Sequence, residues 1–114
     1  MANLSDETLL VALFRQGRLL KLLDEVTKAD MTIYERFGET ESTITALIQL
    51  QNSRERLTNS YTRVTTLLQR VHESQPQADA SLLELFYRSV AEALATADAI
   101  EATVKETKKD WDLL

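Results

Sequence analysis

Residues 82–111 read LLELFYRSVAEALATADAIEATVKETKKDW, and the spacing of their apolar positions predicts how the whole chain folds. Apolar residues recur at alternating steps of three and four, which is typical of helices that pack as coiled coils. One seven-residue row holds Leu83, Val90, Ala97, Val104 and Trp111; the other holds Phe86, Ala93, Ile100 and Leu114, with Thr107 as its only polar member. The pattern predicts a helix over residues 80–111 with one buried face.

Two other segments show the same spacing. In the segment 41–74 the two rows are Leu47, Arg54, Tyr61 and Leu68, and Leu50, Leu57, Val64 and Val71. In the segment 6–37 they are Leu19, Val26 and Ile33, and Leu22 and Ala29. The helical pattern is weaker around Asp30, so a break of the first helix at this residue stays an alternative. Each predicted helix has about 30 residues and is therefore on the order of 45 Å long.

Capping and helix-breaking residues set the expected helix boundaries. Ser5 is a good N-cap for the first helix, and Gly38 suits its C-terminal end. Pro76 ends the second helix, and Asp79 or Ser81 caps the third. The connections near residues 38 and 76 are short, so neighbouring helices should run antiparallel.

These features predict an all-α protein with a single domain over residues 1–114, an elongated antiparallel up-down-up bundle of three long helices with coiled-coil-like packing. An alternative is a helical hairpin that dimerisation completes into a larger bundle with a second chain. The architecture resembles that of spectrin-type three-helix repeats and, more loosely, of small all-helical secretion chaperones. Both resemblances concern shape, and shape alone does not carry function.

The composition narrows the classes of partner and compartment. The formal net charge is -5, and a nucleic-acid binder is expected to be basic, so we expect no nucleic-acid partner. The chain has no cysteine, which gives no reason to expect an oxidising compartment. Asp6 and Glu7 stand where a signal peptide would be basic, and Arg15 interrupts the first apolar run. We therefore expect a cytoplasmic protein without stable membrane insertion.

No pattern in the sequence indicates catalysis or a cofactor. The single histidine, His72, follows Gln69, whereas helical di-metal sites need Glu three residues before His. Without cysteine, no thiolate nucleophile or zinc-thiolate site is available. The two glycines are isolated, so they form no phosphate-binding loop. We therefore expect a protein that is not an enzyme and that has no cofactor and no metal.

The stretch LLVALFRQGRLLKLL, residues 9–23, is apolar nearly all the way round a helix. An ideal helical wheel puts six of these residues on one face, which we expect in the core: Leu9, Ala12, Leu13, Leu19, Leu20 and Leu23. It points four others elsewhere: Leu10, Val11, Phe14 and Leu22. A wide core stripe, a protein interface and a helix lying on a membrane surface are three explanations for this second face.

We favour the protein interface, with five candidate residues: Leu10, Val11, Phe14, Arg18 and Leu22. The sequence thus predicts a protein–protein interaction module that self-associates, with a dimer favoured, or that docks a partner helix. The alternative is a small helical chaperone or regulatory subunit that binds an amphipathic segment of a secreted or larger protein.

Arg54 is the most informative polar residue, because it occupies a row that is otherwise apolar. The antiparallel turn near residue 76 would bring it close to Asp98 or Glu101 on the third helix. We therefore predict an Arg54–Asp98 pair that fixes the register of the helices. In the alternative, the stem of Arg54 covers the core and its guanidinium reaches water.

Overall fold

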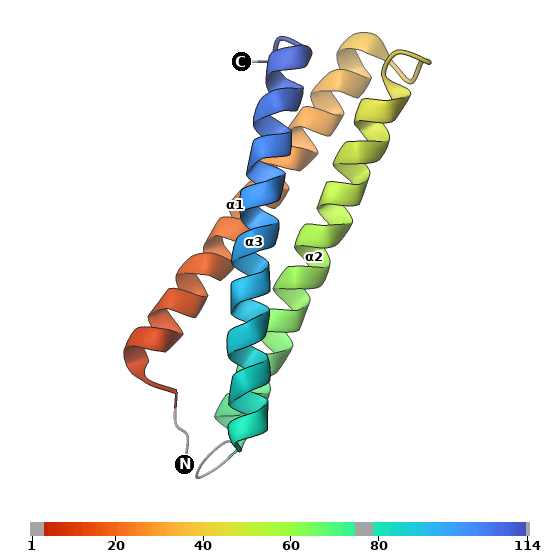
Figure 1. Ribbon diagram of the computed structural model, residues 1–114. Coiled ribbons are helices and arrows are strands. Elements are labelled where there is room, and N and C mark those ends of the chain that lie inside the picture. The colour runs from red at the N-terminus through yellow and green to blue at the C-terminus, as the bar shows by residue number, and fades with distance from the viewer. Residues whose placement is uncertain (1–3, 75–78, 114) are drawn as a thin grey trace.

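The computed structural model describes residues 4–74 and 79–113, and it is an elongated bundle of three helices (Figure 1). The helices are α1 (Asp6–Phe37), α2 (Ile44–Glu73) and α3 (Ala80–Asp110), and each packs against the other two. They run up, down and up, and the molecule measures 55 × 20 × 17 Å. The predicted all-α three-helix architecture is confirmed, whereas its completion by a second chain stays a prediction.

The first helix begins and ends as its capping residues indicate. The hydroxyl of Ser5 accepts a hydrogen bond from the backbone N–H of Thr8, as an N-cap does. At the other end Gly38 has φ +71°, a conformation that favours glycine, and its N–H donates to the carbonyl of Tyr34. Between these ends α1 continues without a break through Asp30.

The connection to α2 is organised around one buried hydroxyl. Thr43 donates a hydrogen bond of 2.7 Å to the carbonyl of Gly38 and accepts one of 2.8 Å from the N–H of Thr40. These bonds hold residues 40–43 in a turn, so α2 begins at Ile44, later than the expected residue 41. Asp79 caps α3 by accepting from the N–H of Leu82, whereas Pro76 lies outside the described residues.

The core consists of the predicted rows, with one exception in α2. All the predicted members in α3 from Leu83 to Thr107 are buried, while Trp111 is half-buried against Phe37 with ring centroids 5.2 Å apart. Leu114 lies outside the described residues. In α2 the row that begins at Leu50 is buried, but the row that contains Arg54 is only half-buried.

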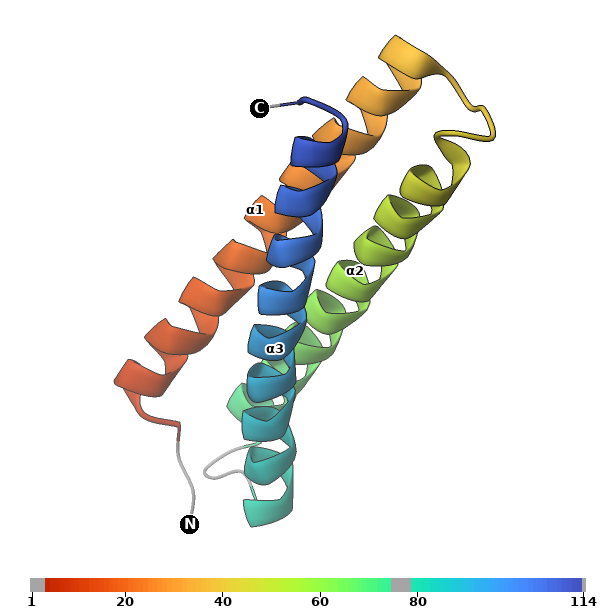
Figure 2. The same ribbon diagram turned by 45° about the horizontal axis from the view of Figure 1, so that its top comes forward.

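The N-terminal half of α1 diverges from the other two helices, which both views show (Figures 1 and 2). Before Leu19 its only buried side chains, among the described residues, are Ala12 and Gln16. The amide nitrogen of Gln16 donates to the carbonyl of Tyr61, at 3.3 Å, and to the hydroxyl of Thr65 on α2. The side chains buried in this part of α1 are thus one small and one polar residue, and most of its large apolar residues stay exposed.

Candidate interaction surface

Five large apolar side chains on the N-terminal half of α1 face the solvent. Phe14 is 78% exposed and Leu10 is 66% exposed, which are high fractions for side chains of this kind. We call the whole group the α1 surface, and its members are Leu10, Val11, Leu13, Phe14 and Leu20. A contiguous apolar group of this kind marks an interaction site more often than scattered single residues do.

The structure corrects which side of α1 faces the core. Leu22 was expected in the interface, but it is only 3% exposed and belongs to the core. Leu13 and Leu20 were expected in the core, but both are exposed. The reason is that leucine occurs on both sides of this stretch, so an ideal wheel does not decide which side faces inward, whereas the seven-residue rows that begin at Leu19 and Leu22 do.

The exposed residues form a second row with coiled-coil spacing, on the side of α1 opposite the core. Leu10, Leu13, Gly17 and Leu20 follow one another at steps of three, four and three. Gly17 is exposed, and a Cβ added to it would meet no atom within 4 Å. The interior of this bundle therefore gives no reason for glycine at this position. This second row was not predicted from the sequence, although the same spacing rule would have found it.

Two hollows border Phe14 in the groove between α1 and α3. One has a volume of about 470 Å³, and the residues around it include Leu10, Val11 and Leu94. The other has a volume of about 490 Å³ and is lined by Gly17, Lys21, Glu25 and Glu101, among others. Phe14 and Arg18 line both hollows. The two hollows thus connect the α1 surface with the flank of α3.

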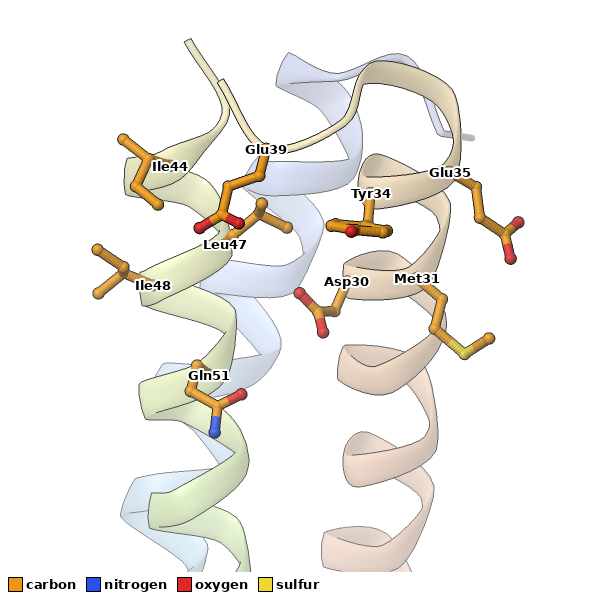
Figure 3. Close-up of a pocket in the computed structure, with 9 residues that line it drawn as sticks. All are labelled: Asp30, Met31, Tyr34, Glu35, Glu39, Ile44, Leu47, Ile48 and Gln51. Carbon is orange, nitrogen blue, oxygen red and sulfur yellow. The ribbon is translucent and has the colours of Figure 1, made fainter. Parts of the chain in front are cut away.

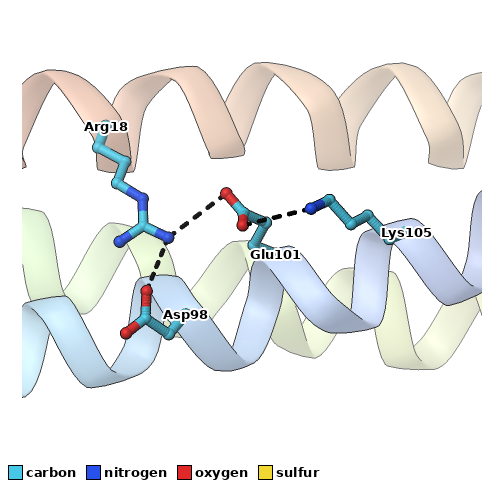
Figure 4. Close-up of polar contacts among 4 residues, drawn as sticks. All are labelled: Arg18, Asp98, Glu101 and Lys105. Carbon is cyan, nitrogen blue, oxygen red and sulfur yellow. Dashed lines mark hydrogen bonds and ion pairs between the residues drawn. The ribbon is translucent and has the colours of Figure 1, made fainter.

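Arg18 ties this surface to α3 by charge (Figure 4). Its Nη2 lies 2.8 Å from Oδ1 of Asp98 and 3.4 Å from Oε2 of Glu101. Lys105 extends the group, with its Nζ 3.6 Å from Oε1 of Glu101. The pKa of Arg18 is raised above its usual value, mainly by the hydrogen bond to Asp98, so the guanidinium stays charged. The group forms a charged edge to the α1 surface, beside Phe14.

The predicted Arg54–Asp98 pair is wrong, because both residues face α1 and not each other. Asp98 pairs with Arg18, and the Nη1 of Arg54 lies 3.9 Å from Oδ2 of Asp30 on α1. The buried position in this part of α2 is taken by Ser53, and the next residue along the helix points about 100° away. Arg54 therefore lies beside the core row, next to α1.

A third hollow lies between α1 and α2 near the turn that joins them (Figure 3). It has a volume of about 420 Å³, and the side chains of Tyr34, Leu47 and Asp30 lie between the two helices there. Nearby exposed apolar residues are Met31, Phe37 and Ile48. This group is smaller than the α1 surface and is interrupted by acidic side chains, among them Glu35 and Glu39.

Searches for other kinds of site and for relatives gave negative findings. Within residues 4–74 and 79–113, no group of three or more His, Cys, Asp or Glu side chains could hold a metal ion. None of the helices, as far as the structure describes them, is long and apolar enough to cross a membrane. Comparisons with known protein families, with curated proteins and with solved structures found no match.

Proposed function

We propose that this protein is a non-enzymatic interaction module that binds protein through the α1 surface. The observation that carries the proposal is the exposure of Phe14 and Leu10 beside a glycine that nothing in the bundle requires. Evolutionary tolerance of one exposed apolar residue is common, but five neighbouring ones expose a continuous area that favours association. Arg18, held by Asp98, supplies a fixed charged edge to that area.

The size of the α1 surface suits a modest affinity. Full burial of a large apolar side chain contributes roughly 1.5–3 kcal/mol. Three or four such side chains must first offset the loss of translational and rotational freedom, on the order of 4–15 kcal/mol. A partner that covers only this surface should therefore bind weakly, and one that also fills the hollows beside Phe14 should bind more tightly.

The test is photo-crosslinking in the cells that make the protein. A benzophenone amino acid replaces Phe14 in one variant and Thr66, an exposed residue on the side of α2 away from the core, in the control. We expect protein adducts from position 14 and few from position 66. Equal labelling at both positions, or no protein adduct from position 14, would contradict the proposal.

A second candidate function is a small chaperone or regulatory subunit that holds an amphipathic helix of another protein. The two hollows that flank Phe14 favour it, because they offer places for apolar side chains of an incoming helix. The mass of the adducts at position 14 separates self-association from the chaperone function. A self-associating module gives an adduct of twice the mass of the chain, whereas a chaperone gives an adduct with a different protein.

A further inference from the structure

We propose that the α1 surface is covered by the α1 surface of a second copy, with the two helices antiparallel and crossing near residues 13–17. This inference rests on the proposed function and names its partner. It follows from the spacing, size and charge of the residues that this side of α1 presents.

The second row of α1, Leu10, Leu13, Gly17 and Leu20, has steps of three, four and three, so its spacing is the same in both chain directions. In an antiparallel pair of helices, the first position of one seven-residue repeat packs against the fourth position of the other. Leu10 and Gly17 hold first positions, and Leu13 and Leu20 hold fourth positions. One register then places Leu10 against Leu20 of the partner subunit, and Leu13 against Gly17 of the partner subunit. The twofold axis repeats both contacts, so four layers form without a polar residue in them.

This pairing explains why position 17 is a glycine. Glycine lowers the stability of a helix interior, and the bundle itself leaves open space at this position. Opposite Leu13 of the partner subunit, the missing Cβ makes room for a large side chain and lets the helices approach closely. Phe14 lies beside these layers, next to Phe14 of the partner subunit, where two aromatic rings near the twofold axis can stack.

Charged residues beside the apolar layers are complementary in the same register. Glu7 and Lys21 are exposed and lie on the same side of α1 as Phe14. The antiparallel arrangement brings Glu7 close to Lys21 of the partner subunit, twice in each dimer. At the two ends of the contact Asp6 meets Asp24 of the partner subunit, where the ion pair of Asp24 with Lys28, at 2.9 Å, lessens the repulsion. The apolar layers between these ends therefore define the contact.

The other arrangements bury charge. An antiparallel register shifted by one repeat places Leu13 against Asp24 of the partner subunit, and a shift by two repeats places Leu20 there. A parallel pair stacks Asp24 on its own copy. Removing a carboxylate from water between apolar side chains is costly even when it keeps a partner such as Lys28, so these arrangements are disfavoured.

Cysteine cross-linking tests the arrangement, because the chain has no cysteine of its own. Leu10→Cys and Leu20→Cys are made singly and together, and the purified proteins are oxidised under mild conditions. Positions 10 and 20 are both exposed, so the variants should keep the fold, and circular dichroism checks this. We expect the double variant to form a covalent dimer and each single variant to stay largely uncrosslinked, because only 10 and 20 face each other.

The outcomes separate this inference from the proposed function. Efficient cross-linking by the single variants would show a parallel pair and overturn the inference. A wild-type chain that light scattering finds monomeric at every concentration, or a dimer that the double variant fails to cross-link, would also overturn it. In either case protein adducts from position 14 would leave the proposed function standing, and their absence would contradict both.

A charge exchange gives a second, independent test of the register. Glu7→Lys and Lys21→Glu should each weaken dimerisation about tenfold, and the two together should restore it. Asp6→Lys is the matched control, since it makes the same charge change in the same helical turn. It should strengthen the dimer by a few fold, because it replaces repulsion from Asp24 of the partner subunit with attraction. If Asp6→Lys and Glu7→Lys have the same effect, the proposed register is wrong.

Discussion

The guanidinium of Arg18 on α1 lies 2.8 Å from the carboxylate of Asp98 on α3, although 79 intervening residues separate them in the sequence. Arg18 comes directly before Leu19, which is buried in the core, and four residues after Phe14, which is exposed. The pair therefore lies between two parts of α1 with different surroundings. On one side the large apolar residues of the helix are buried in the core, and on the other most of them are exposed.

The first prediction concerns the strength of this pair. Arg18→Gln should lower the free energy of unfolding by about 1 kcal/mol or less, because Asp98 is largely solvent-exposed and water screens the charges. Urea denaturation at low and high salt measures this effect, which should shrink as salt increases. In an Asp98→Asn background the Arg18→Gln change should cost less. An equal cost in both backgrounds would mean that Arg18 stabilises α1 through its packed stem instead.

The second prediction separates the two sides of α1. Leu19→Ala should lower the free energy of unfolding by about 2–5 kcal/mol, because it leaves a cavity in the core. Phe14→Ala should change it by about 0.5 kcal/mol or less when measured on the dilute monomer. At high protein concentration Phe14→Ala should also remove any stabilisation that association adds. A large loss for Phe14→Ala in the dilute protein would show that this side chain stabilises the monomer.

The sequence was sufficient to predict the architecture because the apolar spacing and the capping residues indicate the same three helices. The rows of α3, the cap at Ser5 and the glycine at 38 all indicate three helices with ends near those observed. The prediction of which side of α1 is buried failed because leucine occurs on both sides of that helix, so hydrophobicity alone cannot decide which side faces inward. The two seven-residue rows that begin at Leu19 and Leu22 identified the buried side correctly, and the ideal wheel did not.

The failure at Arg54 has a different physical origin. A seven-residue row in a sequence does not indicate which neighbouring helix it faces. In α2 two adjacent rows both had the spacing of a buried face. Burial of the small Ser53 lets α2 pack closely and turns Arg54 toward α1, where Asp30 is available. Only the three-dimensional packing of all three helices decides between such partners.

The third prediction concerns the turn between α1 and α2. Thr43→Val keeps the shape of the buried side chain but removes the hydroxyl that bonds Gly38 and Thr40. It should lower the free energy of unfolding by about 1–3 kcal/mol, because two backbone groups in a part-buried turn lose their hydrogen-bond partner. Thr45→Val, at an exposed position nearby, should change it by about 0.5 kcal/mol or less. Similar losses for both variants in thermal denaturation would refute a special role of the Thr43 hydroxyl.

The last prediction compares the two glycines of the chain. Gly38→Ala should lower the free energy of unfolding by about 1–3 kcal/mol, because φ +71° with ψ -175° is a conformation open almost only to glycine. Gly17→Ala should raise it by about 0.5–1 kcal/mol in the dilute monomer, because alanine favours the helix and meets no atom within 4 Å.

The same Gly17→Ala change should weaken self-association, since its Cβ fills the space proposed for Leu13 of the partner subunit. Thermal denaturation of dilute protein and sedimentation of concentrated protein measure the two effects separately. Their opposite signs are the diagnostic result, because a change that merely improves the helix would leave association unchanged or strengthen it. If Gly17→Ala stabilises the monomer and associates as well as the wild type, close approach at Gly17 has no part in the function of this surface.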